Sequence, residues 1–245
     1  MSTPTAAGDT GTGAGGAAAG GYIPCGFFGQ GGHEPYAGSL STGVGNLTLR
    51  SERSGPEPIG PVHFSVLSWS APATAGEREL LRALRGPVLD VGCGPGRMLT
   101  AARELGLAAM GVDTSAPAVR LAISRGAAAI HGSIFQPVPH EGAWASVLLL
   151  DGNIGIGGNI RGLLERIASL LAPGGQALAE AETDDSLDVA YLAVLEDSTG
   201  RASAAFPWAR AGATALAGHA ARAGLVSVAT RIVQGRVFLT LERRA

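Results

Sequence analysis

The pattern of apolar and polar positions changes character part-way along the chain. In the early part, only Asn46–Arg50 and Pro61–Leu67 alternate as short strands do, among many glycines, prolines and scattered aromatic residues. Residues 1–21 are mostly Gly, Ala and Thr, which bury little side-chain area, so we expect a disordered tail. We expect residues 22–73 to pack as an irregular N-terminal cap over a domain formed by residues 74–245.

From Thr74 onward, segments with strand-like and helix-like periods follow each other regularly. The capping box Thr74–Glu77 begins a helix that reaches about Arg85. The strands predicted next are Pro87–Val91, Ala108–Val112, Ala127–His131, Val147–Leu150 and Gln176–Glu182, and the helices between them are Arg97–Leu105, Ser115–Arg125 and Ile160–Leu171. The last part of the chain predicts a hairpin of Asp188–Glu196 with Arg201–Phe206, a helix Ala209–Ala223, and a closing antiparallel pair, Leu225–Val233 with Arg236–Leu241.

Strands that alternate with helices in this way are typical of an α/β fold, a parallel, doubly wound sheet with helices on both faces. Val147–Leu150 is continuously apolar, as expected of a strand that is covered on both sides. Ligands of such sheets bind beyond the carboxyl ends of the strands. The loops that follow the strands are therefore where a ligand site is expected.

Composition narrows the class of protein. Apolar residues make up 46% of the 245 residues, enough for a core, and the net charge is −2 with no basic runs, which argues against nucleic-acid binding by charge. The N-terminus lacks the basic and apolar regions of a secretory signal, and no apolar run is long enough to span a bilayer. We therefore expect a cytoplasmic protein without a membrane partner. Two cysteines, Cys25 and Cys93, are too few for a disulfide framework or a zinc site, and no metal is expected.

The strongest chemical signal is the glycine-rich loop that follows the strand ending at Val91. It contains Gly92, Gly94 and Gly96, and glycines let a backbone turn tightly and approach a ligand closely. Asp113 lies 21 residues after Gly92, at the end of the next strand, where an acid can bind a ribose diol. The order of strand, loop, helix, strand and acid predicts a nucleoside-containing ligand, with a plain strand–helix turn as the alternative.

The spacing of the glycines indicates which nucleoside-containing ligand the loop would bind. A dinucleotide fingerprint has the pattern G-x-G-x-x-G/A, and here Arg97 occupies the third glycine position. A nicotinamide-dependent oxidoreductase is therefore disfavoured.

The run Asp90-Val-Gly-Cys-Gly-Pro-Gly96 resembles the first motif of class I S-adenosylmethionine-dependent methyltransferases, and the resemblance extends over about residues 74–245. It implies a Rossmann-like, doubly wound, seven-stranded sheet that is mostly parallel with its last strand antiparallel. It also implies S-adenosyl-L-methionine as cofactor. The loop residues Gly92, Cys93, Gly94 and Gly96 would lie against the methionine portion, with Asp90 helping to orient it.

The same resemblance assigns the nucleoside side of the site. Asp113, followed by Thr114, would bind the ribose hydroxyls. Ser133 stands where the family often has an Asp on the adenine amino group, so that contact would be weaker or made by backbone, and Ile134 would pack on the ring.

The loop after the fourth strand of the domain contains Asp151 and Asn153 among several glycines. We expect these two side chains to bind the amino group of the cofactor, the acceptor, or both. The alternative is that Asp151 only caps backbone amides. The loop lacks the Asn/Asp-Pro-Pro-Tyr signature of base-modifying enzymes, which weakens the case for a nucleic-acid substrate.

An oxygen or nitrogen acceptor can also need a base to take its proton. His33 and His63 lie in the expected cap and are the candidate bases, with a structural or exposed position as the alternative for each. Cys93 lies inside the cofactor loop and is assigned no chemistry.

These observations favour a methyltransferase that acts on a small molecule, in specialised biosynthesis. The alternative is a methyltransferase-like protein that binds the cofactor but catalyses a non-methylating reaction or serves as a binding partner. A homodimer is left open.

Overall fold

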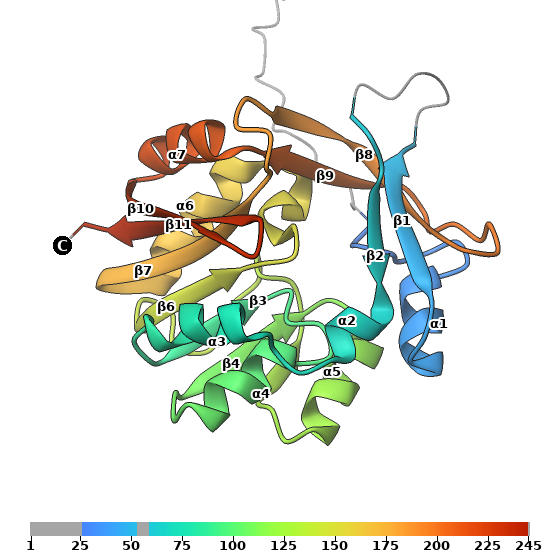
Figure 1. Cartoon of the computed structure of the whole chain (residues 1–245), viewed down its shortest axis with the longest axis horizontal. Helices are drawn as coiled ribbons and strands as arrows, with labels where there is room; N and C mark the ends of the chain where they lie inside the picture. Colours follow the sequence, from blue (N-terminus) through green and yellow to red (C-terminus); the bar gives the residue numbers. More distant parts are fainter. Residues whose placement is uncertain (1–25, 53–58, 245) are drawn as a thin grey trace, which may run out of the picture.

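The computed structural model describes residues 26–52 and 59–244. Its centre is a seven-stranded sheet with the strand order β10-β11-β7-β6-β3-β4-β5 (Figure 1). The strands are β3 (Val88–Val91), β4 (Ala109–Asp113), β5 (Ala129–His131), β6 (Trp144–Leu149), β7 (Leu171–Ala181), β10 (Leu225–Val233) and β11 (Arg236–Arg243). Strands β3 to β7 pair in parallel, whereas β11 is antiparallel to both of its neighbours. The predicted Rossmann-like fold, with its last strand antiparallel, is confirmed.

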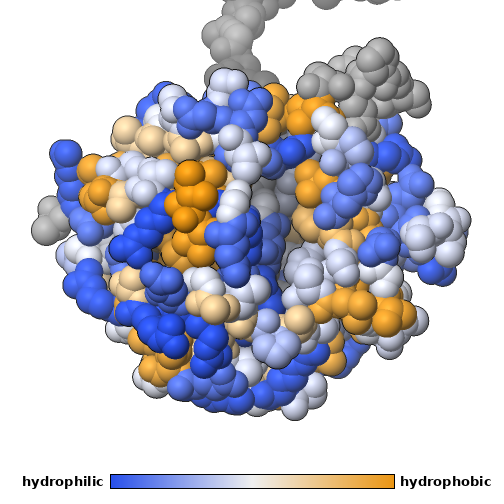
Figure 2. Space-filling model, in the orientation of Figure 1, coloured by the Kyte–Doolittle hydropathy of each residue, from blue (hydrophilic) through white to orange (hydrophobic). Residues whose placement is uncertain are grey.

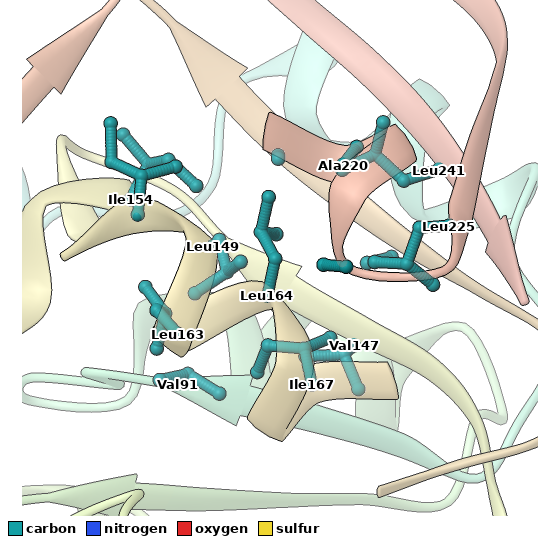
Figure 3. Packing of buried hydrophobic residues seen from close by; sticks show 14 of the residues in the cluster. Val91, Val147, Leu149, Ile154, Leu163, Leu164, Ile167, Ala220, Leu225 and Leu241 are labelled. Carbon is teal, nitrogen blue, oxygen red and sulfur yellow. The ribbon is translucent and has the colours of Figure 1, made fainter. Parts of the chain in front are cut away.

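Helices cover both faces of this sheet. On one face, α6 (Ile160–Leu170) and α7 (Ala213–Arg222) pack in a core with residues of β6, β7 and β11. Figure 3 shows Leu163, Leu164 and Ile167 of α6 directed toward Val147 and Leu149 of the sheet. These helix residues recur at the three- and four-residue spacing of one helix face, which is why the sequence pattern identified this helix.

The opposite face is covered by α3 (Ala75–Arg82) and α4 (Arg97–Glu104). The predicted capping box of α3 is present, since the Thr74 hydroxyl accepts from the Glu77 amide while the Glu77 carboxylate accepts from the Thr74 amide. Helix α5 (Ala116–Ser124) follows β4, and the Ser115 hydroxyl caps its first turn.

A second, four-stranded antiparallel sheet stands beside the carboxyl ends of the parallel strands, with the order β2-β1-β8-β9 (Figure 1). We call it the cap sheet. Its strands are β1 (Asn46–Ser51), β2 (Val62–Ser65), β8 (Asp188–Asp197) and β9 (Phe206–Ala211). It thus combines strands from the segment expected as the cap with strands from the segment expected as the domain. Two short helices, α1 (Pro35–Thr42) and α2 (Val66–Ser70), accompany it.

The carboxyl-terminal half of the cap sheet differs from the prediction. The predicted hairpin is present, because Glu196 bridges to Ala202 and the Ser203 amide donates to the Leu195 carbonyl, but its second strand continues as β9 to Ala211. Helix α7 therefore begins at Ala213, not at Ala209. The chain turns at residues 197–200, where the Asp197 carboxylate accepts hydrogen bonds from the amides of Thr199 and Arg201. Pro207 lies within β9, which a proline tolerates because β9 is an edge strand.

The expected tail, residues 1–21, lies outside the described residues. None of the helices in the described ranges has the length and hydrophobicity needed to cross a bilayer. The face seen in Figure 2 carries hydrophobic residues in small groups among hydrophilic ones, with a hollow between the two sheets.

Candidate active site

A cavity of about 580 Å³ lies at the carboxyl ends of β3, β4, β5 and β6, within the range usual for small-molecule sites. Its two sides differ in origin. One side consists of the loops that follow these four strands. The other side consists of aromatic residues that accompany the cap sheet: Phe27, Phe28, Tyr36, Trp69, Phe206 and Trp208.

The glycine loop borders the first side and requires its glycines. Gly92, Gly94 and Gly96 have φ of 69°, 52° and 83°, in the left-handed region that other residues rarely adopt. A Cβ on Gly92 would lie 2.6 Å from the Asn153 amide nitrogen, and one on Gly96 would lie 2.9 Å from the Ala122 Cβ. Close packing therefore fixes the loop, while its outer surface stays open to the cavity.

Asp113 ends β4 beside this loop and is only 8% exposed. Its carboxylate accepts a hydrogen bond from the Gly94 amide at 2.8 Å and from the Ser115 amide at 2.7 Å. Burial raises the pKa of Asp113, while these two amides oppose that shift. Each carboxylate oxygen can accept more than one hydrogen bond, so the group can still receive two hydroxyls. The neighbouring Thr114 borders the cavity, and its carbonyl accepts from the side chain of Gln30 at 3.1 Å.

Asp90 is the most unusual group in the site. Its carboxyl is 4% exposed, lines the cavity, and receives no hydrogen bond from the described residues. Burial, reinforced by the charge of Asp151, raises its pKa to about 7. A buried carboxyl without a partner is costly, and a cationic or hydrogen-bonding ligand would satisfy it.

The structure brings Asp151 and Asn153 to the same end of the cavity. The Asn153 amide donates to the carbonyl oxygens of Val91 at 2.8 Å and Gly92 at 3.1 Å, so it ties this loop to the glycine loop. Asp151 has a φ of 54° and its amide donates to the Glu180 carboxylate at 2.6 Å.

Two arginines hold the Asp151 carboxylate in an ion-pair network that sequence reasoning missed. Arg97 donates to Asp151 at 2.7 Å and Arg236 donates at 2.8 Å. Both arginines also pair with Glu77, and Arg236 reaches Glu180 at 2.6 Å. Although burial opposes ionisation, hydrogen bonds from Arg97, Thr74 and Arg236 lower the pKa of Glu77 to about 2. The sequence assigned Glu77 only to the capping box of α3. Nothing in the sequence pattern predicted that Arg236 would lie near it.

The remaining predicted site residues divide into two groups. Cys93, Ser133 and Ile134 line the cavity, and burial raises the pKa of the Cys93 thiol well above its ordinary range. His33 and His63 are exposed and are not brought to this cavity. The His63 ring lies 3.1 Å from the Thr48 hydroxyl and borders a smaller cavity of about 290 Å³ between the two sheets.

Tyr36 is a cavity residue that the sequence did not single out. It is 7% exposed, and its phenol oxygen would lie 3.4 Å from a Cβ placed on Gly94. The phenol has no hydrogen bond among the residues described, and burial raises its pKa, so it stays protonated. Its ring packs edge-on against Phe28 at 5.4 Å and Trp69 at 5.5 Å. Tyr36 lies in the short helix α1, whose sequence has no clear apolar period. The sequence pattern therefore gave no indication of this residue.

Comparison with known proteins decides the family. A family model described as a methyltransferase domain matches residues 71–220, which is more than half of the chain. The chain belongs to the class I S-adenosylmethionine-dependent methyltransferases. No curated protein matches the sequence.

Solved structures share the fold of this methyltransferase at low sequence identity. A methyltransferase from Bacteroides fragilis, in complex with S-adenosyl-L-homocysteine, has a TM-score of 0.69 at 18% identity, over 85% of this chain and 92% of its own. The CcbJ methyltransferase from Streptomyces caelestis has a TM-score of 0.55 at 17% identity, over 72% and 92%. The 1,6-didemethyltoxoflavin-N1-methyltransferase from Burkholderia thailandensis has a TM-score of 0.53 at 20% identity, over 73% and 81%.

S-adenosylmethionine is the cofactor of this methyltransferase family, and the cavity fits it. The glycine loop leaves space where a Cβ on Gly94 would stand, Asp113 retains acceptor capacity, and Asp90 offers an unpartnered carboxyl. These features suit a ligand that carries a diol and positive charge.

Proposed function

We propose that this protein transfers the methyl group of S-adenosylmethionine to a small molecule, in specialised biosynthesis. The observation that carries the proposal is the two-sided cavity. The loops that follow β3, β4, β5 and β6 form one side, and aromatic residues that accompany the cap sheet form the other. A cavity that is covered by its own chain suits a molecule small enough to enter it. One of the structural relatives is named as a 1,6-didemethyltoxoflavin-N1-methyltransferase and holds 1,6-didemethyltoxoflavin, which supports this proposal.

The bound cofactor supplies an electrophilic methyl on a sulfonium that leaves readily. We assign the ribose hydroxyls to Asp113 and the amino group to Asp90, with the methionine portion along Gly92, Cys93 and Gly94. Ser133 and Ile134 would face the adenine.

We assign Asp151 and Asn153 to orientation of the reactants. Because Arg97 and Arg236 both hold it in place, the Asp151 carboxylate suits the role of a fixed hydrogen-bond acceptor. Positioning is the main contribution that such a site can make to a displacement with an activated leaving group.

The test is transfer of label from methyl-labelled S-adenosylmethionine to cell extract separated into a low-molecular-weight fraction and a protein and nucleic-acid fraction. We expect label in the low-molecular-weight fraction only, and none with Asp113→Ala. Label in the macromolecular fraction contradicts the proposal. Cofactor binding by calorimetry without transfer to any fraction would favour the alternative, a protein that binds the cofactor for another purpose.

A further inference from the structure

The second side of the cavity is built from aromatic rings that come from distant parts of the chain. Phe28 precedes α1, Trp69 lies in α2, and Trp208 lies in β9. Phe28 stands at the centre, with ring centroids 5.3 Å from Trp208 and 6.4 Å from Trp69. We call these three residues, with Tyr36 and Phe206, the aromatic wall.

The wall is held rigidly on the side away from the cofactor loops. Trp208 is 4% exposed, and a Cβ on Gly155 would lie 2.6 Å from its indole nitrogen. Phe206 is 1% exposed and packs at 88° to Trp208. Rings that are fixed before a ligand arrives lose little freedom on binding, so the wall is suited to recognising one shape.

The described side chains that line the cavity offer nothing to bind an anionic acceptor. Asp90, Asp113 and Asp151 line it, and Arg97 is the only basic side chain among its described lining residues. Arg97 is already paired with Glu77 and Asp151, and its side chain is 9% exposed. A carboxylate or phosphate entering the cavity would find three carboxylates and no unpaired basic side chain among these described residues.

A cationic acceptor is disfavoured for a different reason. The cofactor itself brings a sulfonium and an ammonium into the same cavity, so a second cation would be repelled at short range in a site partly removed from water. The wall itself favours an uncharged acceptor, because it offers π faces and edges that suit planar rings in stacked or edge-on contact.

We propose that the methyl acceptor is an uncharged planar ring compound, aromatic or heteroaromatic, bound against the aromatic wall. The proposal rests on the proposed function, because it names the substrate class of the same cavity. Phe28, Trp69 and Trp208 are the residues that determine this specificity.

Calorimetry with three probes of similar size tests the proposal: 2-naphthol, its saturated counterpart decahydro-2-naphthol, and the anion 2-naphthoate. Each is titrated into the full-length protein at pH 7, with and without saturating S-adenosylhomocysteine. We expect 2-naphthol to bind at least about tenfold more tightly than either other probe. Equal binding of decahydro-2-naphthol, or tighter binding of 2-naphthoate, overturns the proposal.

A matched pair of variants tests whether the preference for 2-naphthol depends on the aromatic wall. Trp69→Leu should reduce 2-naphthol binding at least about fivefold, with S-adenosylhomocysteine affinity kept. Leu192→Ala, an exposed change on β8 of the same cap sheet, should leave both unchanged. An undiminished 2-naphthol affinity in Trp69→Leu, with the same melting temperature, also overturns the proposal.

The experiment distinguishes failure of the proposed function from failure of the proposed acceptor class. Failure of S-adenosylhomocysteine to bind would contradict the proposed function, while the ring preference would still be decided by the titrations without it. Normal S-adenosylhomocysteine binding without ring preference would contradict the acceptor class alone.

Discussion

At the scale of single residues, the site contains polar atoms that the rest of the described chain leaves without partners. The Asp90 carboxyl and the Tyr36 phenol are both more than nine-tenths buried and both border the cavity. An unsatisfied buried polar group costs about 1–3 kcal/mol of folding free energy. These two residues therefore lower the stability of the ligand-free protein, and a bound ligand can recover that loss.

The buried carboxyl of Asp90 should make both the stability of the protein and its affinity for the cofactor depend on pH. Its pKa of about 7 lies above the ordinary value, so the neutral form is favoured in the ligand-free protein. Because the folded-state pKa is raised, Asp90 favours the folded protein below the pKa of about 4 that it has in the unfolded chain. This contribution to the free energy of unfolding is lost as the pH rises through 7. Binding of the cationic cofactor prefers the carboxylate. We expect affinity for S-adenosylmethionine to increase about tenfold from pH 6 to pH 8, measured by calorimetry.

The control for this prediction is Asp90→Asn, which cannot ionise. Its affinity should be weaker at pH 8 and nearly independent of pH over the same range. An equal pH dependence in both proteins would assign the titration to another group.

The variant Tyr36→Phe tests whether the phenol of Tyr36 serves the fold or binds the ligand. Removing an unsatisfied hydroxyl should leave the melting temperature unchanged or raise it. Loss of one hydrogen bond should weaken S-adenosylhomocysteine binding about three- to tenfold, since the phenol lies over Gly94. Calorimetry and thermal denaturation check both effects. A lower melting temperature with unchanged affinity would show that the phenol serves the fold.

Asp151→Asn tests orientation of the reactants. The change keeps the shape of the side chain and removes the charge between Arg97 and Arg236. We expect turnover at saturating cofactor to fall about a hundredfold, with cofactor affinity changed less than about threefold. Asp188→Asn is the control, because that residue forms a partly exposed pair with His219 on another part of the molecule. Unchanged turnover in Asp151→Asn would remove the residue from the reaction.

At the scale of elements, the sequence predicted what depends on local pattern. The strands from β3 to β7, the capping box at Thr74 and the loop from Gly92 to Gly96 follow from periodicity and from glycine chemistry. The loops that form the first side of the cavity were therefore foreseeable. Helix α1 and strand β9 were not, because their aromatic residues are ordered by packing against each other across the chain. The Glu77–Arg236 pair is likewise a product of tertiary structure alone, since 159 positions separate the two residues.

Gly111 shows how closely two elements meet behind the cofactor loop. It lies in β4, and a Cβ there would come 2.4 Å from the Cys93 sulfur and 2.7 Å from Leu99 Cδ1. We expect Gly111→Ala to destabilise the protein by about 1–3 kcal/mol in urea unfolding and to weaken cofactor binding, because the loop must shift. Gly38→Ala in α1 meets nothing within 4 Å and should be neutral or stabilising. Equal stability of the two variants would contradict the packing at Gly111.

At the scale of the whole molecule, the two sheets depend on each other. Strand β1 lies between β2 and β8, and its Leu47 and Leu49 are 0% and 1% exposed. The part of the chain before residue 74 thus completes a core to which residues 188–211 also belong.

This arrangement predicts the behaviour of a fragment. Residues 74–245 expressed alone should be aggregation-prone or melt at least about 10 °C below the full chain, because β8 becomes an unprotected edge and the cap-sheet core is lost. Thermal denaturation and light scattering give the measurement. A soluble fragment that melts like the full-length protein would show that the earlier segment is an independent addition.

The pairing of β1 with β8 also sets an order of events on the ribosome. Arg50 of β1 meets Glu196 of β8, and 146 positions separate them in the chain. At about 5–20 residues per second, roughly 7–30 s pass between synthesis of the first and arrival of the second. During that interval the apolar residues of β1 have been synthesised but are not yet covered by β8. The glycine loop is also translated before Phe206 and Trp208, which border the cavity from β9. The nascent chain therefore completes its binding cavity late, and slow codons or chaperone contact between these two points should affect the yield of folded protein more than changes elsewhere.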